Sequence, residues 1–284
     1  MIHFGSAGNP EDFYEKGYKK SEDMPKYLAE MGLNAYEYEC SRGVRISEEK
    51  AKKLKEEAEK YGISLSVHSP YYISLSTQEE EKKIKTIQYI TDSMRAAKNM
   101  GADRVVVHAG ALLGLERSYA VESACSLLQR AMQEADKQGL GEIHICPETM
   151  GKINQLGDSK EIIQMCLLDD RFLPTIDFGH LYCRHLGTLQ TKEDWKKELE
   201  MYIDALGYER MKHFHSHFSH MEYSKGGEKR HVTFKEEGYG PDFQVIAEVL
   251  HELKLEPTIV CESAGTQSLD AKQMKEIYEK TKKE

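Results

Sequence analysis

The feature that most constrains the fold is an alternation of a short β-branched or apolar run, a turn and an amphipathic helical pattern, read as eight such units along the chain. Strands are predicted over residues 2–5, 35–39, 64–68, 104–108, 142–147, 173–177, 211–216 and 257–262. Helical spacing of apolar residues predicts helices over residues 47–61, 79–100, 115–137, 160–168, 192–206, 243–253 and 269–282. Because parallel strands are joined through crossover helices, this order predicts a parallel sheet.

The length of the chain favours a closed barrel over an open sheet. Eight units within 284 residues fit an α/β fold of the (β/α)8 TIM barrel type, and we expect residues 1–284 to form one domain. No GxGxxG motif follows the first predicted strand, which disfavours a dinucleotide-binding fold.

Composition limits where the protein acts and what it contacts. The chain has no apolar run of about 18 residues, the length that a membrane helix needs, and no basic and apolar leader. Its six cysteines include no CxxC pair, so we expect reduced thiols and a cytoplasmic location. We also expect no membrane contact and a monomer. The net charge of −9 does not favour nucleic acid, although bound cations would offset it locally.

Six consecutive predicted strands each end in a residue type that binds metal ions. These residues, with one more just beyond the sixth strand, are His68, His108, Glu148, Asp177, His180, His215 and Glu262. The carboxyl ends of barrel strands open onto one face, so these side chains are expected to converge. Clustered carboxylates repel one another unless cations bridge them. Imidazoles and carboxylates suit zinc, and the number of donors predicts two or three Zn²⁺ ions, with Mn²⁺ as an option at one site.

Three histidines compete for the position at the seventh strand. His213, His215 and His217 share one strand face, because side chains alternate along a strand. The alternation alone does not say which is the ligand. We take His215, at the predicted strand end, as the ligand and His217 as a neighbour that contacts substrate.

Short motifs in these segments resemble the endonuclease IV family (AP endonuclease family 2), within the xylose isomerase-like TIM barrel superfamily. The motifs are VHSPYY at 67–72, VHAG at 107–110, PETMG at 147–151, IDFGH at 176–180, FHS at 214–216, RH at 230–231, EGYG at 237–240 and CES at 261–263. Each motif is weak alone, whereas their order and spacing are specific, and they span nearly the whole chain.

The resemblance implies a zinc-dependent endonuclease that cuts DNA 5′ to abasic sites in base excision repair. Carried over position by position, it implies three zinc ions. His68, His108 and Glu148 would hold one ion. Glu148 would bridge to a second, held also by Asp177, His215 and Glu262. His180 and His231 would serve the third.

The same resemblance extends to catalysis and DNA contacts. It implies that Glu148 orients the nucleophile as the catalytic carboxylate. Tyr71 and Tyr72 match an intercalating pair, with rim packing as the alternative. Arg42, in the loop after the second strand, is a candidate to fill the gap in the DNA or to hold phosphate.

Two positions depart from the family pattern. Lys229 stands where the family has an aspartate ligand, so the third site is left to use Glu228, to use water or to bind metal weakly. The family's His-x-Asn-Asp signature reads HSHF at 215–218. Two other functions stay open. One is a metal-dependent sugar or sugar-phosphate isomerase or epimerase that places Glu148 and Glu262 about the sugar, and the other is a non-catalytic binding protein.

Overall fold

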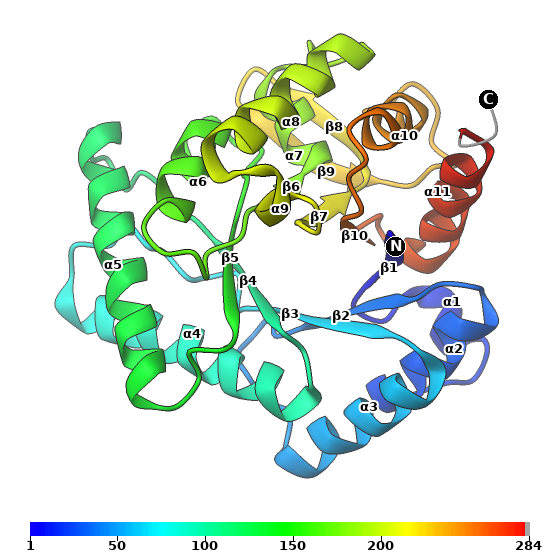
Figure 1. Ribbon diagram of the computed structural model, residues 1–284, viewed down its shortest axis with the longest axis horizontal. Coiled ribbons are helices and arrows are strands. Elements are labelled where there is room, and N and C mark those ends of the chain that lie inside the picture. The colour runs from blue at the N-terminus through cyan, green and yellow to red at the C-terminus, as the bar shows by residue number, and fades with distance from the viewer. Residues whose placement is uncertain (282–284) are drawn as a thin grey trace.

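Eight parallel strands close into a barrel in the computed structural model, which describes residues 1–281 (Figure 1). The barrel closes where β1 pairs with both β2 and β10. The strands are β1 (His3–Ala7), β2 (Ala35–Glu39), β3 (Ser64–His68), β4 (Arg104–His108), β5 (His144–Glu148), β6 (Thr175–Asp177), β7 (His215–Phe218) and β10 (Thr258–Cys261). The predicted (β/α)8 TIM barrel is therefore confirmed.

The seven predicted helices are present on the outside of the barrel (Figure 1). They are α3 (Glu48–Tyr61), α4 (Glu80–Met100), α5 (Arg117–Lys137), α6 (Ser159–Cys166), α8 (Lys192–Leu206), α10 (Phe243–Glu252) and α11 (Gln267–Thr281). The predicted last residue of α11, Lys282, lies outside the described residues. Local chemistry sets several of the ends: the Ser47 side chain caps the start of α3, and Gly62 ends it with a φ of 68°.

Several short elements escaped the sequence prediction. Between β1 and β2 lie α1 (Glu11–Glu15), a 3₁₀ turn (Ser21–Asp23) and α2 (Met24–Glu30). Two more short helices are α7 (Phe178–Arg184) and α9 (Tyr208–Met211), and β8 (His220–Ser224) pairs antiparallel with β9 (Gly227–Val232). The helices are too short for a helical period to identify, and the two strands lie outside the alternation of strand and helix that the prediction followed. No helix among residues 1–281 has the length and apolarity that a membrane crossing requires.

The predicted seventh strand, residues 211–216, is wrong in register. Its first residue ends α9, and β7 begins only at His215. The Arg210 guanidinium donates to the carbonyl oxygens of Cys166 and Asp169 at 2.6 and 2.8 Å, which anchors this turn against the end of α6. After this turn, β7 begins at His215 and continues to Phe218.

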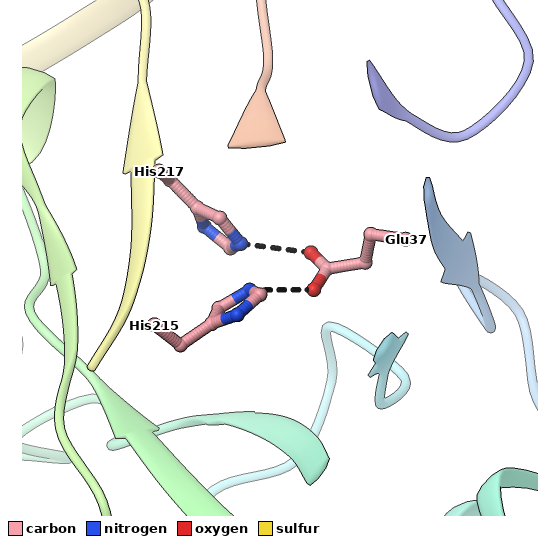
Figure 2. Close-up of side chains that lie close together, drawn as sticks. All are labelled: Glu37, His215 and His217. Carbon is pink, nitrogen blue, oxygen red and sulfur yellow. Dashed lines mark hydrogen bonds and ion pairs between the residues drawn. The ribbon is translucent and has the colours of Figure 1, made fainter. Parts of the chain in front are cut away.

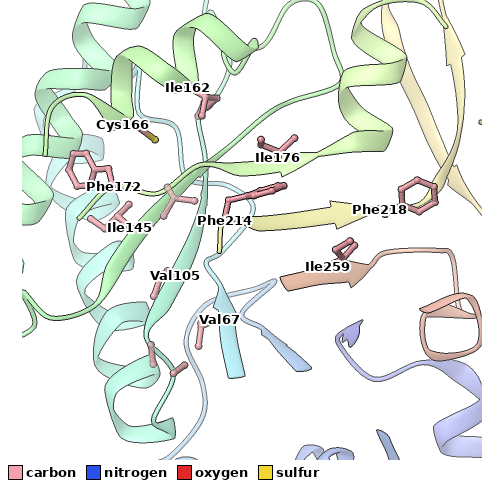
Figure 3. Packing of buried hydrophobic residues seen from close by; sticks show 14 of the residues in the cluster. Val67, Val105, Ile145, Ile162, Cys166, Phe172, Ile176, Phe214, Phe218 and Ile259 are labelled. Carbon is pink, nitrogen blue, oxygen red and sulfur yellow. The ribbon is translucent and has the colours of Figure 1, made fainter. Parts of the chain in front are cut away.

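Alternation along the strands separates the apolar core from the barrel interior. Val67, Ile176 and Ile259 belong to the buried cluster packed beneath the helices (Figure 3). The residue after each of the first two, His68 or Asp177, points the other way, into the barrel, because successive side chains lie on opposite faces. Strands in register thus present their terminal polar side chains to one centre.

Candidate metal centre

A cavity of about 370 Å³ opens at the carboxyl ends of the barrel strands. It is lined by Glu39, Ser41, His68, Ser69, Tyr71, His108, Glu148, Met150, Lys152, Gln155, His180, Glu228, His231 and Glu262. Of the predicted metal ligands, His68, His108, Glu148, His180, His231 and Glu262 are in this lining. Asp177 is fully buried just beneath it, beside Glu148 and Glu262.

The first potential metal site joins His68 and His108 through Glu148. The Nε2 atoms of the two histidines lie 3.3 and 3.2 Å from Oε2 of Glu148. Nδ1 of His68 lies 2.8 Å from the carbonyl oxygen of Ser69. A carbonyl oxygen only accepts, so Nδ1 donates a proton to it, and Nε2, which faces Glu148, is the nitrogen that a metal ion would bind.

The second potential site shares Glu148 and adds Asp177, His217 and Glu262. Nδ1 of His217 lies 3.4 Å from an oxygen of Glu148 and 3.4 Å from an oxygen of Glu262. Oδ2 of Asp177 is buried and accepts no hydrogen bond, and it lies 3.2 Å from Nδ1 of His180. Burying a carboxylate oxygen without a hydrogen bond is costly, and a coordinated cation would remove that cost.

The third potential site consists of His180, Glu228 and His231. Nδ1 of His180 lies 2.9 Å from the carbonyl oxygen of Thr149 and donates to it, so Nε2, 3.6 Å from Glu228, is the nitrogen that a metal ion would bind. Nδ1 of His231 lies 2.8 Å from the Ser219 hydroxyl. The two histidines come from α7 and β9, and Glu228 comes from β9.

Lys229 does not occupy this third site. Its side chain is exposed and forms an ion pair with Glu222 on the adjacent strand β8. The ladder is irregular here, since Glu222 pairs with Arg230 and Tyr223 with Glu228, so Lys229 is the extra residue of a bulge. Glu228 and His231, on either side of it, both line the cavity. Among the alternatives left open by the sequence, the geometry places Glu228 in the carboxylate position.

His215 does not lie where the sequence analysis placed it. In the barrel register, His217 is level with Asp177, whereas His215 is level with Thr175, two residues deeper. His215 contacts Glu37 in the barrel interior, as Figure 2 shows. The prediction that His215 ends its strand was wrong because β7 extends two residues further than the apolar pattern indicated.

Two carboxylates of β2 were missed. Glu37 is completely buried, and Glu39 lines the cavity with an oxygen within 4.8 Å of both Glu37 and Glu262. The segment reads Tyr36-Glu37-Tyr38-Glu39. Glutamates at alternate positions of a predicted barrel strand point to one face, and an acidic face inside a barrel was the available signal.

The acidic cluster holds protons on its histidines. Burial by itself lowers the pKa of His68, but the negative charges of Glu39 and Glu148 raise it to about 10. His180 and His217 have their pKa raised well above the usual range by neighbouring carboxylates, against the same effect of burial. Burial raises the pKa of Glu262 to about 8. Positive charge is therefore required among these carboxylates.

These residues fit bound metal ions. The donors are imidazole nitrogens and carboxylate oxygens, which zinc and similar ions accept. A carbonyl, hydroxyl or carboxylate oxygen lies beside the second ring nitrogen of four of the five histidines, as is usual for metal ligands. Asp177, whose buried Oδ2 accepts no hydrogen bond, belongs to the second group.

The predicted DNA-contacting residues lie around the cavity mouth but not together. Tyr71 is 58% exposed and lines the cavity. Tyr72 is 44% exposed, packs edge-on against Tyr89 and borders a neighbouring cavity of about 610 Å³. Arg42 is exposed in the loop after β2, and its neighbour Ser41, rather than Arg42 itself, lines the metal-site cavity.

The fold and site define the class of the protein: a closed parallel barrel whose His and carboxylate clusters at the carboxyl face could hold metal ions. The model of the family described as xylose isomerase-like TIM barrel matches residues 25–283. The chain belongs to this family, which confirms the resemblance indicated by the sequence motifs.

The relatives by sequence include an uncharacterized protein and a probable endonuclease. The chain is 34% identical over 266 residues to the uncharacterized protein MJ0133 of Methanocaldococcus jannaschii, covering 93% of this chain and 92% of that protein. It is 26% identical over 152 residues to the probable endonuclease 4 of Acholeplasma laidlawii, covering 51% and 50%.

Two solved structures share the fold at low sequence identity. Endonuclease IV from Thermus thermophilus superposes with a TM-score of 0.70 at 16% identity, covering 99% of this chain and 99% of that one. A D-tagatose 3-epimerase-like protein superposes with a TM-score of 0.70 at 20% identity, covering 99% of this chain and 97% of that one. These similarities establish the fold and leave the choice of reaction to the site.

Proposed function

We propose that this protein is a zinc-dependent endonuclease that hydrolyses the phosphodiester 5′ to abasic sites in DNA. The observation that carries the proposal is the presence of three adjoining groups of metal-ligand residues, two of which share Glu148. A reaction on one sugar would need the second group alone. The histidines of the other two groups extend the site along the cavity, as a substrate with a phosphodiester and two sugar oxygens requires.

The metal centre suits phosphodiester hydrolysis. Bound ions would supply a water of lowered pKa and would neutralise charge on the phosphate oxygens. Glu148 holds four histidines in place. Its carboxylate lies within 3.4 Å of ring nitrogens of His68, His108, His180 and His217. It fixes these imidazoles about one point and is placed to orient the attacking water.

The rim of the cavity offers contacts for a nucleic acid despite the net charge of −9. The exposed Lys152 lines the mouth, where a cation would meet phosphate, and Tyr71 presents an aromatic face beside it. Aromatic faces stack on bases without regard to sequence. Turning an abasic nucleotide out of a duplex is less costly than unstacking an intact base, and this difference supports selectivity.

The test is incision of a duplex with one synthetic abasic site, with metal content measured on the same preparation. We expect metal-dependent cleavage 5′ to the lesion that is lost in Glu148→Gln. The matched control is Glu142→Gln, since Glu142 precedes the same strand at the opposite end of the barrel and its side chain is 63% exposed. No incision by a zinc-loaded protein would refute the proposal.

A metal-dependent sugar or sugar-phosphate epimerase is the second candidate. The specific observation in its favour is the second group, in which Glu148 and Glu262 both lie 3.4 Å from Nδ1 of His217. Two carboxylates about one metal are a suitable pair for moving a proton on and off a sugar carbon. A panel of ketoses and their phosphates, with proton exchange from D₂O followed by NMR, tests this alternative on the same protein.

A further inference from the structure

Glu37 lies inside the barrel beneath the metal centre, with no exposed surface. Its two carboxylate oxygens point to different imidazoles (Figure 2). Oε1 lies 2.8 Å from Nε2 of His217, and Oε2 lies 2.8 Å from Nε2 of His215. Oε2 also accepts a hydrogen bond of 2.7 Å from the Ser66 hydroxyl. This buried carboxylate belongs to none of the three metal groups of the proposed site.

Two arrangements fit three such side chains. Glu37, His215 and His217 have donor atoms within 4.8 Å of one another, as a metal site would. Alternatively, both imidazoles donate N–H groups to the carboxylate. The second nitrogen of each ring decides between them, because a neutral imidazole has one lone pair and one N–H.

His217 turns its other ring nitrogen, Nδ1, toward the second potential metal site. Its Nδ1 lies 3.4 Å from Glu148 and from Glu262, the carboxylates of the second potential site. If Nδ1 binds a cation there, Nε2 carries the proton and donates it to Glu37. The carboxylate–imidazole–metal order is the usual way in which proteins fix the tautomer and orientation of a ligand histidine.

The surroundings of His215 also favour the arrangement in which both imidazoles donate Nε2–H to Glu37. Its Nδ1 is buried and has no hydrogen-bond partner. A metal on Nε2 would force a proton onto Nδ1 and leave a buried N–H without an acceptor, which is rare in proteins. With the proton on Nε2, the group left unmatched is an acceptor lone pair, which proteins tolerate more often.

We propose that Glu37 is a positioning residue that orients His217 toward the second metal site by accepting a hydrogen bond from its Nε2–H. His215 donates its Nε2–H to the other carboxylate oxygen and so holds Glu37 in place. The proposal rests on the metal centre of the proposed function. It assigns no ion to the interior group of Glu37, His215 and His217. It also gives His215 a role in the barrel interior, two residues below the site that the sequence suggested.

The first test compares zinc binding by wild type, Glu37→Gln and Ser66→Ala in competition with a chromophoric chelator. The two imidazoles lie against different oxygens of Glu37, and a glutamine side chain has an acceptor oxygen at only one of these two positions. We expect Glu37→Gln to lose about 10–100-fold in affinity for one ion, the range found for such supporting partners. Ser66→Ala is the matched control, because it removes a hydrogen bond to the same carboxylate and leaves both imidazoles in place.

The second test uses the wild type alone, so it still tests the role of Glu37 if the Glu37→Gln variant fails to fold. Long-range ¹H–¹⁵N spectra of the zinc-loaded wild type report which nitrogen of each histidine carries the proton. We expect His215 and His217 both to be protonated on Nε2. Zinc on Nε2 of His217, or a further ion that binds wild type and is lost in Glu37→Gln, would overturn the inference, as would unchanged affinity in a folded Glu37→Gln.

These outcomes separate the inference from the proposed function. Zinc affinity and imidazole tautomers are measured without DNA, so a protein that passes both tests and fails to cut abasic DNA refutes the endonuclease alone. A wild type that binds no zinc would overturn both.

Discussion

Zinc loading should release protons, and its pH dependence follows from the charges of the site. In the metal-free protein, His68, His180 and His217 hold protons at neutral pH because neighbouring carboxylates raise their pKa against the effect of burial. Glu262, with its pKa raised to about 8 by burial, is also mostly protonated. Coordination requires the free lone pairs of these imidazoles and an ionised carboxylate, so three imidazoles and one carboxyl give three to four protons.

The magnitude follows from linkage between metal and protons. Each released proton changes the overall binding constant tenfold per pH unit, or about 1.4 kcal/mol. Three to four protons therefore weaken loading by about three to four powers of ten for each unit by which the pH falls, or about 4–5 kcal/mol. The sign is fixed because low pH favours the protonated, metal-free form.

Calorimetry measures this directly. Titrating zinc into the metal-free protein in two buffers of different ionisation enthalpy gives the number of protons released, and chelator competition at pH 6, 7 and 8 gives the slope. Release of fewer than one proton, together with affinity that does not change between pH 6 and 8, would refute the assignment of these histidines as ligands.

Three further changes test the fold and the site. Gly157→Ala should lower stability by about 1–3 kcal/mol and weaken zinc binding, because Gly157 has a φ of 107° and its Cβ would lie 2.9 Å from the Glu148 carbonyl oxygen. Gly139→Ala is the control in urea unfolding, since its Cβ would meet open space and only the positive φ would cost about 1 kcal/mol; equal effects would contradict the reasoning. Tyr72→Ala should weaken binding of abasic DNA in a gel-shift assay with metal content unchanged, whereas Tyr61→Ala, at the far end of α3, should not; unaltered binding in Tyr72→Ala would remove it from the DNA interface. Trp195→Ala should lower the free energy of unfolding by about 3–5 kcal/mol, because its ring is buried against Phe178 with centroids 5.5 Å apart; a loss under 1 kcal/mol in urea denaturation would count against this packing.

The sequence by itself determined the barrel and most of the site. Helical and strand periods in alternation leave few folds open, because each parallel strand needs its own crossover. A polar residue at the end of such a strand has its direction fixed by the pleat. His68, His108, Glu148 and Glu262 were found this way, since all four stand where an apolar run stops.

Only the tertiary structure decided which residues of β7 and β9 face the cavity. A strand's period is two, so a pattern of HFHSH is equally consistent with His215 or His217 at the top. Pairing with β6 places His217 level with Asp177. The β8–β9 hairpin likewise turns Glu228 inward and leaves Lys229 at the surface, a choice that depends on the register between strands.

The contacts of Glu37 could not be predicted from the sequence. Its partners His215 and His217 lie 178 and 180 residues further along the chain, and no local pattern links them. Closure of the barrel brings β2 and β7 across the interior from one another. The sequence thus determined which residue types gather at the carboxyl face, whereas long-range strand register decided which nitrogen meets which oxygen.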